Sequence, residues 1–90
     1  MPRIAFTPQL RRFTATPEFD SASATTLRAL LDEAFARNPA LRGYVLDDQG
    51  HLRPNIAIFI DWQRSTERRQ LDQPLLAGST VHVLQALSGG

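Results

Sequence analysis

The stretch that decides the fold is Leu27-Arg28-Ala29-Leu30-Leu31-Asp32-Glu33-Ala34-Phe35-Ala36-Arg37. Its apolar side chains recur at the spacing of one helix face, and most of its charged side chains lie on the other face. Small hydroxylated residues at positions 21–26 precede it and suit a helix N-cap. Asn38-Pro39 follows and ends the helix, because a residue before proline avoids helical backbone angles. The sequence therefore predicts one amphipathic α-helix with a single apolar stripe.

Two extended segments carry the clearest strand patterns. Asn55-Ile56-Ala57-Ile58-Phe59-Ile60-Asp61 places its isoleucines on one face and its alanine and phenylalanine on the other. Branched residues of this kind favour β-strands. Residues 80–87 alternate in the same way, so that the valines face the helix while His82 and Leu84 face outward.

Shorter extended pieces are expected elsewhere in the chain. Residues 3–7 and 17–20 predict two short strands that form an N-terminal hairpin. Asp47-Asp48-Gln49-Gly50 predicts a turn between extended pieces at 44–46 and 51–53. Because adjacent aspartates before a glycine are typical of turns, we do not interpret this pair as catalytic.

Residues 62–69 are polar and charged and predict an exposed loop. This loop carries a basic patch of three arginines, Arg64, Arg68 and Arg69. The simplest interpretation is that these side chains are solvated. Contact with an acidic partner surface is the alternative. Trp62 is expected to cap the rim of the core. Residues 71–76 are short and contain a proline, which predicts at most one turn of 3₁₀-helix.

The order of these elements is strand, strand, helix and then several strands. One helix and one sheet can close a single core between them. The expected fold is α+β, a β-grasp or ubiquitin-like roll, with a mixed sheet of about four or five strands packed on one main helix. Its first and last strands are adjacent and parallel. Residues 1–86 form the domain, and residues 87–90 form a flexible C-terminal tail.

The composition excludes several classes of function. Ninety residues suffice for one domain, and a net charge of +1 gives no basic field for nucleic acid. No apolar run is long enough to cross a membrane. Cysteine is absent, so disulfides, thiolate metal sites and a cysteine nucleophile are excluded, and the cytoplasm is the default compartment. His51 and His82 lie in separate elements, and we expect no metal site.

The sequence ends in Gly89-Gly90. Glycine has no side chain, so two glycines make a tail slender enough for a narrow channel, with backbone angles open to both signs of φ. Such a tail would deliver its terminal carboxylate to the active site of another protein. The alternative is an ordinary flexible chain end.

Four segments together resemble the small sulfur-carrier family, which includes the small subunit of molybdopterin synthase and the sulfur carrier of the thiamine pathway. Residues 7–11 are similar to the proline-containing first turn of several family members, and residues 55–61 are similar to the central strand of the family. Residues 77–81 are similar to the family's entry to the last strand, and residues 83–90 are similar to its closing diglycine segment. The resemblance covers nearly the whole chain.

The resemblance implies that this chain is a co-substrate and not an enzyme. In the family, a partner of the ubiquitin-activating type uses ATP and magnesium to adenylate the terminal glycine, here Gly90, with Gly89 leading it into the active site. A sulfur donor then displaces AMP and leaves a thiocarboxylate. A sulfur-accepting synthase would consume it, or a metalloprotease would trim the tail. The chain itself would bind no cofactor or metal.

Docking to these partners requires a surface. Exposed apolar residues gathered on a sheet are a plausible binding patch. We expect this patch to comprise Phe59, His82, Leu84, Leu87 and Ser88.

Two other functions remain open. The chain could be a ubiquitin-like modifier joined through Gly90 to a lysine of a target protein, which begins with the same adenylation. It could also be a β-grasp interaction domain without tail chemistry. An enzyme acting alone is the least expected function, since no nucleophile–base pair, metal set or phosphate loop is present in the sequence.

Overall fold

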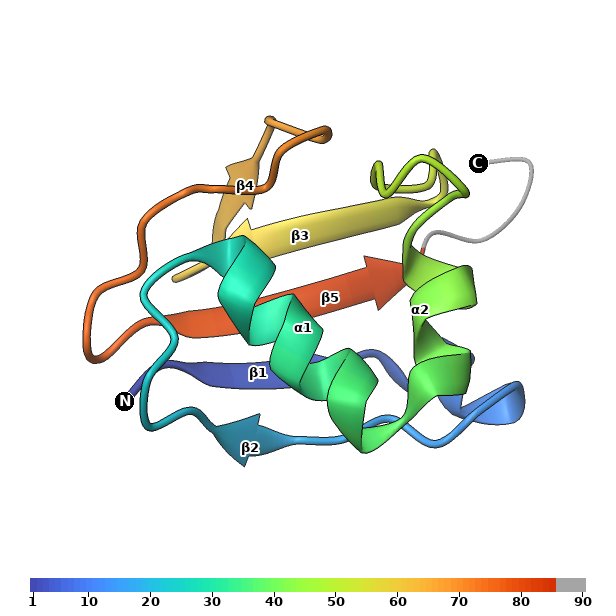
Figure 1. Ribbon diagram of the computed structural model, residues 1–90, viewed down its shortest axis with the longest axis horizontal. Helices are drawn as coiled ribbons and strands as arrows, with labels where there is room; N and C mark the ends of the chain where they lie inside the picture. The colour runs from blue at the N-terminus through green and yellow to red at the C-terminus, as the bar shows by residue number, and fades with distance from the viewer. Residues whose placement is uncertain (86–90) are drawn as a thin grey trace.

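The computed structural model describes residues 1–85 and shows a sheet with two helices on one face (Figure 1). The elements are β1 (Arg3–Phe6), the 3₁₀-helix η1 (Pro8–Arg12), β2 (Phe19–Asp20), α1 (Leu27–Arg37), α2 (Pro39–Val45), β3 (Ile56–Ile60), β4 (Gln63–Ser65) and β5 (Thr80–Gln85). The expected boundary between a domain and a tail at residue 87 lies outside the described residues.

The five-stranded sheet has the order β2-β1-β5-β3-β4. β5 lies at its centre, parallel to β1 and antiparallel to β3. The first and last strands are therefore neighbours, as the sequence predicts, and this arrangement is the β-grasp fold. The chain enters the central strand last, so the described part of the chain ends in the middle of the sheet, at Gln85.

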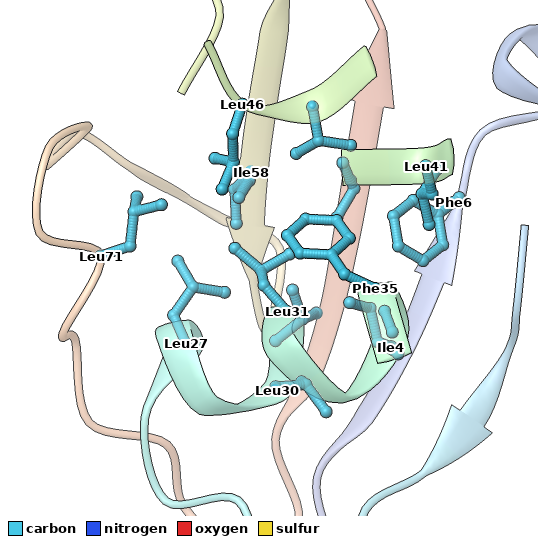
Figure 2. Packing of buried hydrophobic residues seen from close by; sticks show 14 of the residues in the cluster. Ile4, Phe6, Leu27, Leu30, Leu31, Phe35, Leu41, Leu46, Ile58 and Leu71 are labelled. Carbon is cyan, nitrogen blue, oxygen red and sulfur yellow. The ribbon is translucent and has the colours of Figure 1, made fainter. Parts of the chain in front are cut away.

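α1 packs its apolar stripe on the inner face of the sheet. Thr26 caps its first turn, where the hydroxyl oxygen accepts a hydrogen bond from the backbone N–H of Ala29 at 3.2 Å. The predicted stripe is fully or almost fully buried: Leu27, Leu30, Leu31, Ala34 and Phe35. Figure 2 shows side chains of α1 directed into the same cluster as Ile4 of β1 and Ile58 of β3.

A second helix, α2, replaces the extended piece expected at 44–46. Pro39 does end α1, but its fixed φ also suits the first turn of a new helix. α2 buries Leu41 and Val45 against the core. Leu41 and Phe6 belong to the same buried cluster (Figure 2). Only a single bridge, between Leu46 and Leu52, remains of the extended pieces expected around the turn.

The segment after β3 also differs from the expectation. The two residues Asp61 and Trp62 form a hairpin turn, and residues 63–65 pair with β3 as the edge strand β4. A 3₁₀-helix lies at η1, whereas residues 71–76 adopt no helical turn. Within residues 1–85, no helix has the length and apolar character needed to cross a membrane.

Candidate functional site

The candidate site lies on the outer face of the sheet, opposite α1, around the strand that leads into the tail. Val81 and Val83 of β5 point into the core and are 0% exposed. His82 and Leu84 alternate with them and are half-buried on the outer face. The sequence predicted this alternation, and the structure confirms it.

Phe59 joins these two residues through the strand register. It lies directly opposite His82, and Ala57 lies directly opposite Leu84. Residues directly opposite each other in a sheet share a face, so Phe59, His82 and Leu84 lie together as expected. We call these three residues the outer patch. Their role in binding a partner stays a prediction.

Trp62 also belongs to this face, and the expectation that it caps the rim of the core was wrong. Its indole stacks on the imidazole of His82, with ring centroids 3.9 Å apart and an interplanar angle of 20°. The side chain remains 68% exposed. The hairpin turn between β3 and β4 brings it there, a turn that the polar composition of residues 62–69 concealed.

A hollow of about 200 Å³ opens beside this stack. Trp62 and His82 form one side of it, and the end of β1 with the start of η1 forms the other. Leu84 lies along its wall. The lining residues are Ala5, Phe6, Thr7, Pro8, Trp62, His82, Val83 and Leu84.

The root of the tail is held at the same end of β5. The backbone N–H of Thr7 donates to the carbonyl of Val83 at 3.0 Å. The Thr7 hydroxyl oxygen accepts from the backbone N–H of Gln85 at 3.2 Å. The remaining predicted site residues, Leu87, Ser88, Gly89 and Gly90, lie outside the described residues.

The basic patch expected at residues 64–69 separates into different roles. Arg68 is half-buried, and its guanidinium donates to the carbonyls of Ile56, at 2.7 Å, and Arg53. It therefore fastens the loop after β4 to the start of β3. Arg64 is exposed and lies opposite Phe59, on the outer face. Of these two arginines, Arg64 extends the outer patch, and no local sequence pattern distinguishes it from Arg68.

The turn at Asp47 is structural, as expected. Its carboxylate accepts hydrogen bonds from the backbone N–H groups of His51, at 3.0 Å, and Gln49, at 2.9 Å. The hydrogen bond from His51 is the main reason why the pKa of this carboxyl lies below its ordinary value. Residues 1–85 contain no group of three or more acidic or histidine side chains that could hold a metal ion.

A search by family models matches residues 4–90 to the ThiS family. The match covers the sheet except for Arg3 at the start of β1, both helices and the diglycine. A sequence search of curated proteins gives no match.

Several solved structures are similar over nearly their entire length. The crystal structure of SAMP1 from Haloferax volcanii has a TM-score of 0.76 and 22% identity, covering 99% of this chain and 98% of that one. A chain of the BexX/CysO complex from Amycolatopsis orientalis has a TM-score of 0.77 and 18% identity, with full coverage of both chains. The solution structure of small archaeal modifier protein 1 from Methanosarcina acetivorans has a TM-score of 0.75 and 22% identity, covering 99% and 95%. At these identities the likeness establishes the fold.

Proposed function

The chain belongs to the ThiS family, and from this membership we propose that it is a sulfur carrier activated at Gly90. The match through the diglycine carries the proposal. It is supported by the topology, in which the central strand β5 runs directly into the tail. We propose that a partner of the ubiquitin-activating type adenylates Gly90, and that the product donates sulfur in the biosynthesis of a cofactor, an amino acid or a siderophore.

The proposed chemistry makes a poor electrophile reactive in two steps. A carboxylate oxygen of Gly90 attacks the α-phosphorus of ATP, which the partner binds with magnesium, and pyrophosphate leaves. Sulfur at the oxidation level of sulfide then attacks the carbonyl carbon of this mixed anhydride, and AMP leaves. The product is a thiocarboxylate on Gly90. The chain is a co-substrate in both steps, and the catalytic groups belong to the partner.

The length of the tail explains why the outer patch would contact this partner. Gly90 follows Leu84 by six residues, and a fully extended chain of that length spans about 20 Å. An enzyme that encloses Gly90 in its active site therefore lies against the sheet near Leu84. We propose that it docks on Phe59, His82 and Leu84, and that Leu87 and Ser88 contact the channel leading to Gly90.

A second candidate is a ubiquitin-like modifier that is joined through Gly90 to a lysine of a target protein. It shares the adenylation step, and the similar structures from Haloferax volcanii and Methanosarcina acetivorans carry the name SAMP1, small archaeal modifier protein 1. The two functions differ in what attacks the activated carbonyl, sulfur or an amine. A β-grasp interaction domain without tail chemistry is the remaining alternative.

The direct test of activation is ATP–pyrophosphate exchange by the adenylating enzyme of the host. We expect exchange to depend on this chain and to disappear when Gly89 and Gly90 are deleted. Gly78→Ala is the matched control, because a Cβ at this exposed glycine meets no atom within 4 Å. Exchange that persists without the two terminal glycines would refute activation at Gly90 and favour the interaction domain.

A further inference from the structure

The hairpin turn at Asp61 and Trp62 has an unusual backbone for its residues. Both have positive φ, 51° at Asp61 and 66° at Trp62. A two-residue loop with positive φ at both positions is a type I′ turn, which favours Asn-Gly or Asp-Gly. Asp61 suits the first position, but a tryptophan at the second position is strained, and glycine would relieve that strain.

Local hydrogen bonds hold the turn in this conformation. The backbone N–H of Asp61 donates to the carbonyl of Thr80 at 2.9 Å, and the Asp61 carboxylate accepts from the N–H of Thr80 at 2.9 Å. These bonds are independent of the indole. The two-residue loop between β3 and β4 therefore requires the positive φ at position 62, but it does not require a tryptophan there.

The position of the indole contributes little to the core. Trp62 is 68% exposed and rests on His82. Within residues 1–85, the imidazole Nδ1 of His82 is buried and has no hydrogen-bond partner, which is a second local cost. Two unfavourable features, one at Trp62 and one at His82, thus meet where the two rings stack. Strained backbone of this kind is concentrated at binding sites, where the surface is shaped in advance.

The indole forms a wall of the hollow beside His82. The opposite wall consists of Ala5, Thr7 and Pro8, and Leu84 lies along the side. An apolar cavity of about 150 Å³ accommodates a benzene ring. The hollow of about 200 Å³ is therefore large enough for one aromatic or branched aliphatic side chain.

We propose that this hollow is a socket for one apolar side chain of the enzyme that acts on Gly90. The proposal rests on the function proposed above. The six residues that follow Leu84 span at most about 20 Å, so an enzyme that binds Gly90 must lie close to the hollow. This enzyme is therefore the occupant. Arg64 indicates which charge the enzyme would carry next to the socket. It is exposed beside Phe59 and forms no salt bridge with residues 1–85, so a carboxylate of the enzyme next to the socket would pair with it.

The decisive variant is Trp62→Gly, because it removes the wall and relieves the strain together. We expect its melting temperature to equal or exceed that of the wild type, since Asp-Gly suits the turn. We expect the KM for this chain in ATP–pyrophosphate exchange to rise about tenfold or more, as for a central aromatic contact, while kcat stays the same. Leu76→Ala is the matched control, because this apolar residue is 76% exposed but does not line the hollow.

Two further measurements separate the socket from a general weakening. Arg64→Glu should raise KM more at low salt than at high salt, because added salt screens exposed charges. Trp62 is the single tryptophan of the chain, so 5-fluorotryptophan incorporated there gives one ¹⁹F signal. We expect this signal to shift when the unlabelled enzyme is added.

The outcomes distinguish the two proposals. A normal KM for Trp62→Gly, together with an unchanged ¹⁹F signal, overturns the socket while activation at Gly90 stands. A wild-type chain that supports no exchange overturns both. A raised KM with unchanged or higher stability supports the socket, because loss of folding cannot explain it.

Discussion

The hydroxyl oxygen of Thr7 accepts a hydrogen bond from the backbone N–H of Gln85, at 3.2 Å. This contact joins the end of the first strand to the end of the last strand, across 78 positions of sequence. Gln85 is the final described residue, so the contact marks the root of the tail. It fixes the point from which the proposed route to Gly90 begins.

Loss of this hydroxyl should loosen the root of the tail without unfolding the domain. Thr7→Val keeps the shape of the side chain and removes the acceptor, at a cost of about 0.5–1.5 kcal/mol. We expect faster amide hydrogen exchange at Gln85, with little change at the central residues of β5. Thr7→Ser keeps the hydroxyl and is the control. Equal exchange rates in Thr7→Val and the wild type would show that the hydrogen bond does not hold the strand end.

Adjacent positions on β5 should respond oppositely to the same substitution. Leu84→Asp places a charge on the outer face, and we expect a change in the free energy of unfolding of at most about 1 kcal/mol. The same variant should lose about tenfold or more in kcat/KM for exchange. Val83→Asp buries a charge in the core and should cost more than about 4 kcal/mol.

Thermal unfolding and the exchange assay measure both effects. An unfolded Leu84→Asp protein would show that Leu84 belongs to the core. A folded and fully active one would remove Leu84 from the docking surface.

The fold could be predicted from the sequence where periodicity is strong. The stripe of α1 and the alternation in β3 and β5 each involve many residues, and all three elements were confirmed. α2 was missed because proline signals both the end of one helix and the start of another.

The candidate site was only partly predictable. His82 and Leu84 were placed by strand alternation alone. Trp62 was misplaced because tryptophan at a type I′ turn contradicts the local preference of that turn. The role of Arg68 depends on contacts with residues 12 and 15 positions away, which no local pattern encodes. Local conflicts with propensity are most frequent at functional sites.

Two arginines of the same loop region should differ in their effect on stability. Arg68→Ala removes the guanidinium hydrogen bonds to the carbonyls of Arg53 and Ile56, although Arg53 still accepts from the N–H of Ile56, and we expect a loss of about 1–3 kcal/mol in the free energy of unfolding. Arg64→Ala should change it by less than about 0.5 kcal/mol, because Arg64 is exposed. Urea denaturation measures both values. Equal losses would contradict the assignment of Arg68 as the structural residue.

Glu67 should make the free energy of unfolding depend on pH in the acidic range. Its carboxylate accepts hydrogen bonds from the backbone N–H groups of Leu71, Gln70 and Arg69, and the bond from Leu71 is the main cause of a pKa below the ordinary 4.5. A carboxyl with a lowered folded pKa stabilises the protein above its unfolded pKa. This contribution is lost as the pH falls through the folded pKa.

Glu67→Gln mimics the protonated form and therefore provides the comparison. We expect the urea midpoint of the variant to lie below that of the wild type at neutral pH. The two midpoints should converge as the pH falls below 4.5. A constant difference between the midpoints across this range would mean that the charge of Glu67 makes no contribution.

The central claim is that Gly90 carries sulfur, and the mass of the C-terminal peptide tests it most directly. No arginine or lysine follows Arg69 in the sequence, so trypsin releases residues 70–90 as one peptide. In protein isolated from its own host, we predict that part of this peptide is heavier by the difference between one sulfur and one oxygen atom, with the change located at Gly90. An unmodified peptide, together with target lysines that carry the chain through Gly90, would contradict the carrier and establish the modifier. An unmodified peptide without such conjugates would contradict both.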